Sequence, residues 1–91
     1  MKKIAVFPGS FDPFTKGHEC IIEKALHLFD EVVIAIGQNT SKQYLFSLES
    51  RKAHIESLFD QHDQVSVEVF SGLSVRFCES IGAKYIVRGL R

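Results

Sequence analysis

The sequence predicts an α/β fold in which helices pack on both faces of a parallel sheet. Two short, continuous apolar runs, at residues 4–7 and 32–36, are typical of strands that are covered on both faces. Apolar residues recur at helical spacing at 17–29, after Ser47 and at 74–81, so that strand and helix patterns alternate along the chain. This alternation predicts the order βαβαβαβ and hence a parallel sheet.

The spacing of apolar residues predicts three helices. Those of the first helix, over 17–29, are Ile21, Ile22, Ala25, Leu26, Leu28 and Phe29. Ser47 can cap the second helix, and the inward face of this helix is predicted to carry Leu48, Ile55, Leu58 and Phe59. Its solvated face is predicted to carry Glu49, Arg51, Lys52 and Glu56. The third helix, over 74–81, ends at Gly82, which readily adopts the left-handed conformation that terminates helices.

Two more strands complete the sheet. Residues 65–69 alternate between valine and polar residues, which favours a strand with one exposed face near the sheet edge, and 85–87 form the last strand. Right-handed crossovers then give the strand order 3-2-1-4. Ligands of such sheets bind at the carboxyl ends of the strands where the order reverses, which is between strands one and four. Residues 8–11 and 88–91 are expected to meet there.

The composition excludes several classes of protein. The 91 residues suffice for one small domain. Basic and acidic residues both number 11, and this balance argues against binding to nucleic acid or to acidic membranes. No stretch reaches membrane-spanning length, and the apolar run near the N-terminus stops at Pro8, too early for a signal peptide. A cytoplasmic protein is expected, with Cys20 and Cys78 as reduced, buried thiols.

The chain stops directly after a central type of strand and leaves only one helix for the second face of the sheet. We therefore expect residues 1–91 to form a single domain that is truncated after its fourth strand and incomplete at the C-terminus, or one whose bare face a partner covers.

The loop after the first strand carries the strongest chemical signal. It reads Phe-Pro-Gly-Ser-Phe-Asp-Pro-Phe-Thr-Lys-Gly-His from Phe7 to His18. Gly9 lets a ligand approach the main-chain N–H groups closely, and the next helix presents free N–H groups and the positive end of its dipole. His18 falls in the first turn of that helix, directed at an anion bound there. The alternative is that His18 is only a polar helix-start residue.

The residues Gly9-Ser10-Phe11-Asp12-Pro13, followed by Thr15-x-Gly17-His18, resemble the signature of the nucleotidyltransferase superfamily that carries an (H/T)xGH motif. Threonine at position 15 resembles the phosphopantetheine branch, which often has threonine where this chain has Ser10. The resemblance covers essentially the whole chain. It implies a Rossmann-like domain of an enzyme that transfers AMP from ATP to 4′-phosphopantetheine and releases pyrophosphate and dephospho-coenzyme A.

The resemblance also implies roles for individual residues. His18 is the implied catalytic residue, which stabilises the transition state of an in-line attack. The implied ATP-binding residues are Ser10, Phe11, His18, Gly89, Leu90 and Arg91. The residues implied to bind phosphopantetheine are Ser10, Lys42, Ser74 and Arg88, of which Lys42 and Arg88 hold its phosphate.

No residue is predicted to ligate a metal, because Mg²⁺ in such sites is held largely by substrate phosphates. Relatives assemble as hexamers, so a homo-oligomer is implied. Two alternatives stay open at this point. The first is another adenylyl- or cytidylyltransferase of the superfamily, and the second is a domain that binds nucleotide without turning it over.

Overall fold

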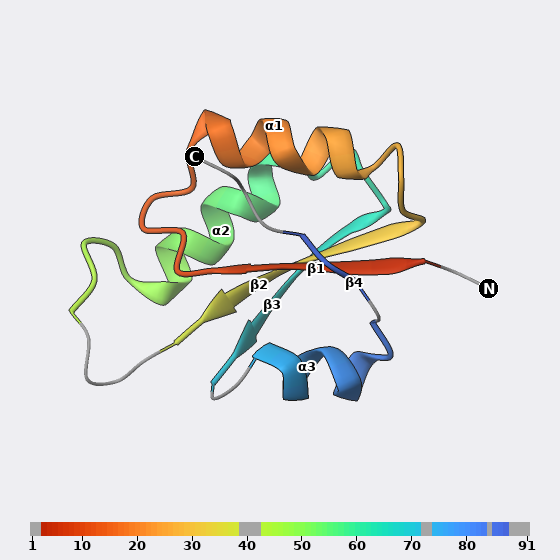
Figure 1. The fold of residues 1–91 in the computed structure, drawn as a ribbon. Coiled ribbons are helices and arrows are strands. Elements are labelled where there is room, and N and C mark those ends of the chain that lie inside the picture. The colour runs from red at the N-terminus through yellow and green to blue at the C-terminus, as the bar shows by residue number, and fades with distance from the viewer. Residues whose placement is uncertain (1–2, 39–42, 72–73, 84, 88–91) are drawn as a thin grey trace.

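The computed structural model describes residues 3–38, 43–71, 74–83 and 85–87, and it contains the predicted alternation of strands and helices (Figure 1). The strands are β1 (Ile4–Gly9), β2 (Glu31–Gly37), β3 (Val65–Phe70) and β4 (Tyr85–Ile86). The helices are α1 (Lys16–Ala25), α2 (Leu48–Leu58) and α3 (Ser74–Ile81). The predicted order βαβαβαβ is confirmed.

The four strands form one parallel sheet in the order β3-β2-β1-β4, as the crossover argument predicts. β1 and β2 pair over their full common length, from Ile4 opposite Glu31 to Gly9 opposite Ile36. On its other side, β1 pairs with β4, and the Val87 N–H extends this pairing by donating to the Val6 carbonyl at 2.8 Å. The order therefore reverses at β1. The carboxyl end of β1 leads into residues 10–15, the signature loop.

Helices cover both faces of the sheet, also as predicted. Figure 1 shows α1 and α2 on one face and α3 on the other. The larger core lies under α1 and α2, and its fully buried residues include Ile22, Val32, Ile34, Ile36 and Ile55. The smaller core lies under α3 and contains Val6, Val33, Ala35, Cys78 and Ala83. The aliphatic centre of the sheet thus supplies both cores.

Both cap predictions are confirmed. The Ser47 side chain accepts a hydrogen bond from the Ser50 N–H at 3.1 Å and caps α2. Gly82 follows α3 with φ of +74°, the left-handed region that glycine enters without a steric penalty. β3 is an edge strand in which Ser66 and Glu68 are exposed, again as predicted.

The helix predicted over 17–29 is wrong in its second half. α1 ends at Ala25, and a turn over 26–28 leaves Leu28 70% exposed. The chain turns early because it must return to the start of the sheet, where the Lys3 N–H donates to the Asp30 carboxylate at 2.6 Å. Leu58, at the end of α2, is also exposed at 39%, contrary to the prediction for that helix.

One expectation of burial also fails. Cys20 is exposed, whereas Cys78 is buried as predicted, and its burial raises the pKa of the Cys78 thiol. Tyr85 and Ile86 in β4 are 42% and 38% exposed. None of the helices in this part has the length and apolar character needed to cross a membrane.

The difference in burial between Ile22 and Leu28 predicts that truncating these two side chains has unequal effects on stability. Ile22→Ala should lower the free energy of unfolding by about 2–5 kcal/mol, because it leaves a cavity at a fully buried position. Leu28→Ala, at the exposed turn, should change it by less than about 0.5 kcal/mol. Urea unfolding followed by circular dichroism measures both values. Equal losses would mean that Leu28 packs in the core.

Candidate functional site

The loop after β1 adopts a strained turn at Phe11. Its φ is +51°, a region that bulky residues rarely enter. The Phe11 ring is nevertheless buried, with its centroid 5.4 Å from that of Phe7 and 5.2 Å from that of Phe14. A Cβ atom at Gly9 would lie 2.9 Å from this ring. The packing of Phe11 therefore requires glycine at position 9, in addition to the close approach of a ligand that the sequence suggested.

Asp12 joins this loop to the segment before α2. Its carboxylate accepts hydrogen bonds from the Leu45 N–H at 2.5 Å and from the Phe46 N–H at 2.8 Å. Both donors are backbone groups of a segment more than 30 residues away in the sequence. The carboxylate thus fixes the distance between the loops that follow β1 and β2.

Arg51 makes the second connection, and its position contradicts the prediction of a solvated helix face. The residue is only 4% exposed. Its Nε donates to the Phe46 and Ser47 carbonyls at 3.1 and 3.3 Å, and one Nη donates to the Ser10 carbonyl at 2.8 Å. The guanidinium carbon also lies 4.2 Å from the centre of the Tyr44 ring. Arg51 lies on the inward face of α2 because the segment before the helix and the signature loop enclose it.

His18 forms a capping box with Thr15 at the start of α1. The His18 N–H donates to Thr15 Oγ1 at 3.5 Å, and the Thr15 N–H donates to His18 Nδ1 at 3.0 Å. Nδ1 also lies 3.1 Å from Thr15 Oγ1. Because the Thr15 N–H can only donate, its bond to Nδ1 favours the neutral tautomer with the proton on Nε2. Helix capping and presentation of an Nε2–H donor are therefore compatible, although the sequence posed them as alternatives.

Aromatic rings surround this imidazole. The centroids of Phe11 and Phe14 each lie 5.2 Å from that of His18, and Phe7 lies at 5.9 Å. Three rings and one cap thus restrict the rotation of His18. The result is a fixed donor beside the Ser10–Phe11 turn and the N-terminal end of α1, where backbone N–H groups favour an anion.

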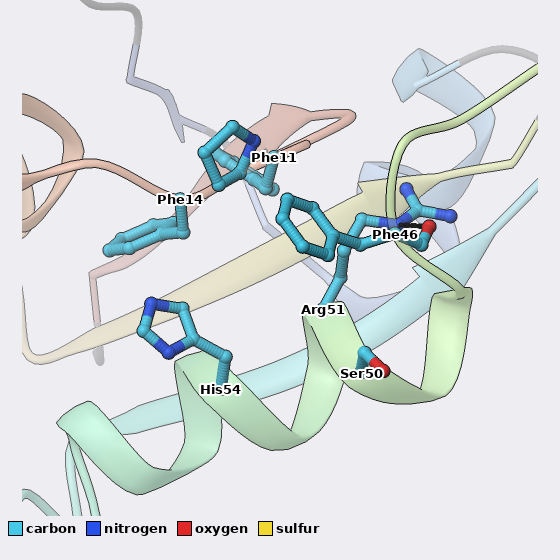
Figure 2. Close-up of a pocket in the computed structure, with 7 residues that line it drawn as sticks. Phe11, Phe14, Phe46, Ser50, Arg51 and His54 are labelled. Carbon is cyan, nitrogen blue, oxygen red and sulfur yellow. Dashed lines mark hydrogen bonds between the residues drawn. The ribbon is translucent and has the colours of Figure 1, made fainter.

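A pocket of about 300 Å³ lies between the signature loop and α2 (Figure 2). In Figure 2, Ser50, Arg51 and His54 project from α2, with His54 on the side of Phe14 and Arg51 beside Phe46. The pocket is lined by Phe11, Pro13, Phe14, Phe46, Ser50, Arg51 and His54. Of the predicted site residues that the structure describes, only Phe11 lines it. The pocket therefore lies beside the predicted phosphate site and does not coincide with it.

Other predicted site residues fall outside the described parts of the chain, namely Lys42, Arg88, Gly89, Leu90 and Arg91. Ser74 begins α3, but its side chain is not among those described. Within the described ranges no three histidine, cysteine, aspartate or glutamate side chains lie close enough together to hold a metal ion. The structure thus brings together Ser10, Phe11 and His18.

Asp12 and Arg51 are the positions that sequence reasoning misses. The pattern around Asp12 indicates only turn chemistry. The charge of Arg51 favours the solvated face, although the residue lies three positions after Leu48 and four before Ile55, both on the inward face. Residues at these spacings share one helix face, so the signal is present in the sequence.

A parallel sheet of this order, with a glycine-containing turn after β1, has the architecture of a nucleotide-binding α/β domain. Comparison with family models agrees. Residues 6–91 match the model described as cytidylyltransferase-like, and the chain belongs to this nucleotidyltransferase family.

More specific similarity comes from curated proteins named phosphopantetheine adenylyltransferase. The chain is 53% identical over all its residues to that of Cytophaga hutchinsonii and covers 61% of it. It is 55% identical to that of Christiangramia forsetii, covering 60%, and 47% identical to that of Leptospira biflexa, covering 57%. The chain thus spans about three fifths of the length of these relatives.

Solved structures give the same fold. A bifunctional NMN adenylyltransferase/ADP ribose pyrophosphatase from Francisella tularensis superposes with a TM-score of 0.78 at 30% identity, over 100% of this chain and 33% of that one. A structure from the same organism and of the same description, complexed with AMP and a manganese ion, has a TM-score of 0.64 at 34% identity. It covers 89% of this chain and 25% of the other.

The capping box makes a prediction about the protonation of His18. The neutral imidazole should carry its proton on Nε2, because Nδ1 accepts the Thr15 N–H. Long-range ¹⁵N–¹H correlation spectra of the histidine rings distinguish the two tautomers. His54, on the exposed surface of α2, provides the comparison. A neutral His18 with its proton on Nδ1 would contradict the capping geometry.

Proposed function

We propose that this chain forms the phosphate-binding part of an enzyme that transfers AMP from ATP to 4′-phosphopantetheine. The observation that supports this most directly is the fixed imidazole of His18, with its Nε2 proton, beside the Ser10–Phe11 turn at the start of α1. Curated relatives at 47–55% identity carry the name of this activity.

The reaction requires no nucleophile from the protein. A phosphate oxygen of 4′-phosphopantetheine attacks the α-phosphorus of ATP, and a new P–O bond forms there. The bond between the α-phosphorus and the oxygen that bridges to the β-phosphate breaks, and pyrophosphate leaves. Catalysis then depends on positioning and on stabilising charge at the α-phosphate. In this proposal the N–H groups of Ser10 and Phe11 and the Nε2–H of His18 donate to its oxygens.

The remaining roles follow from likeness to the phosphopantetheine branch. Lys42, Ser74 and Arg88 bind the acceptor together with Ser10. Gly89, Leu90 and Arg91 line the side occupied by ATP. A flexible lysine supplies a point charge to the acceptor phosphate, and an arginine supplies two parallel donors.

Mg²⁺ fits this proposal as an ion held by the substrate phosphates. The Asp12 carboxylate, which lies in the loop, already accepts two backbone hydrogen bonds. When bound, the ion neutralises charge on the phosphates. We further infer a cytoplasmic homo-oligomer, a hexamer as in the family.

A substrate panel tests the proposed function against its alternatives. A chain of the relatives' length should form dephospho-coenzyme A from ATP and 4′-phosphopantetheine, as measured by product mass and pyrophosphate release. Faster turnover of NMN, or of CTP with any acceptor in the panel, would favour another transferase of the superfamily. Nucleotide binding without any product would favour a binding domain. The 91-residue chain, assayed in parallel, should form dephospho-coenzyme A much more slowly than the longer chain.

His18→Ala in the same longer chain should lower kcat by about 10²–10³, the usual effect of removing one donor to developing charge. The equilibrium affinity for ATP should change far less, because backbone N–H groups still hold the phosphate. Single-turnover kinetics beside calorimetry separate the two effects. His18→Asn, which restores a neutral donor, should recover part of the rate. An unchanged single-turnover rate would reduce His18 to a helix cap.

A further inference from the structure

Burial of the positive charge of Arg51 has a cost in desolvation free energy. Moving a charged guanidinium out of water is unfavourable unless its donors are satisfied and its charge is compensated. Its hydrogen-bond partners in the described structure are the carbonyl oxygens of Ser10, Phe46 and Ser47, with the Tyr44 ring alongside. A neutral residue could fill the same space on α2. We therefore ask what the guanidinium does at Ser10, the residue of the signature loop to which it donates.

The bond to the Ser10 carbonyl fixes the direction of the next N–H group. Ser10 O and the Phe11 N–H belong to one peptide unit, and this unit is trans, since the cis peptide bond in the described chain lies at Asp12–Pro13. In a trans peptide unit the C=O and N–H point in opposite directions. The Phe11 N–H therefore points away from Arg51. Among the described hydrogen bonds, no protein acceptor receives this N–H.

This peptide unit would otherwise have two orientations available. Phe11 is held at φ of +51°, which costs a non-glycine residue roughly 1–2 kcal/mol. Rotating the Ser10–Phe11 unit would change that angle and turn the N–H away from its present direction. The 2.8 Å bond from the guanidinium opposes this rotation, because it would leave a buried donor without its acceptor.

We propose that Arg51 is a positioning residue for the phosphate site. It holds the Ser10–Phe11 peptide unit in the orientation that directs the Phe11 N–H at the ATP phosphate, and it acts through this unit without touching the nucleotide. The inference rests on the proposed function, since it assigns a purpose to the same turn. It adds a residue of α2 to a site formed otherwise by loops at the carboxyl edge of the sheet.

Substitution by glutamine removes the part of the side chain that reaches Ser10. In Arg51→Gln the side-chain amide nitrogen would occupy the place of the arginine Nε, so the variant retains a donor for the Phe46 and Ser47 carbonyls. It loses the bond to Ser10 and the guanidinium charge beside the Tyr44 ring. A lysine side chain ends near the guanidinium carbon, one bond short of the Nη that reaches Ser10. Lys52→Ala is the matched control, since it removes a positive charge from the next position of the same helix.

In a chain of the relatives' length, Arg51→Gln should lower kcat by about 10–100-fold, somewhat less than outright loss of a transition-state donor. KM for 4′-phosphopantetheine should change little. The unfolding midpoint should fall, because a buried hydrogen bond is lost, so kcat is compared per folded molecule. Arg51→Lys should have an intermediate kcat, and Lys52→Ala should match the unaltered protein. A purely structural role predicts a lower unfolding midpoint with kcat per folded molecule unchanged, and that result overturns the proposal. If Arg51→Gln does not fold, an unchanged kcat in Arg51→Lys overturns it.

A second readout does not depend on turnover. Addition of ATP to ¹⁵N-labelled protein should shift the Phe11 amide resonance, and Arg51→Gln should lose most of that shift. Absence of the shift in the unaltered protein overturns the positioning role, even if dephospho-coenzyme A is formed. A shift that depends on Arg51 supports it, even if 4′-phosphopantetheine proves to be the wrong acceptor. The two proposals can therefore fail separately.

Discussion

The geometry of the candidate site depends on how one peptide unit, Ser10–Phe11, is held. On one side the Arg51 guanidinium donates to its carbonyl, and on the other the Phe11 ring packs against Gly9 and the rings of Phe7 and Phe14. Each contact needs the other. Without the ring packing, the positive φ at Phe11 would be unfavourable, and without the arginine the carbonyl would be free to rotate.

The sheet and α2 position the groups that make these contacts. Parallel pairing of β1 with β2 places the ends of both strands at the same edge, so the loops after them are neighbours. Asp12 then binds two backbone N–H groups before α2, and this fixes where the helix begins. The start of α2 in turn sets the position of Arg51. The anion site that we propose for this chain of zero net charge would thus be made from backbone N–H groups and one histidine.

The fold was predictable from the sequence to the level of strand order, because aliphatic runs such as Val32–Ile36 are long enough to indicate buried strands. The ends of elements were less predictable. Leu28 continues the helical spacing, but the return of the chain to Asp30 ends the helix first. In the site, the glycine-rich turn and His18 were visible as a motif. The burial of Arg51 was signalled by its spacing from Leu48 and Ile55, but its carbonyl partners were not, since no side-chain pattern reports them.

We propose that the Ser10–Phe11 turn and His18 form the binding site of the ATP α-phosphate. A crystal structure of the protein with a non-hydrolysable ATP analogue tests it most directly. We expect α-phosphate oxygens within about 3 Å of the Phe11 nitrogen and of His18 Nε2. Phosphates found instead in the pocket lined by Phe46 and His54, with the turn making no contact to them, would contradict it.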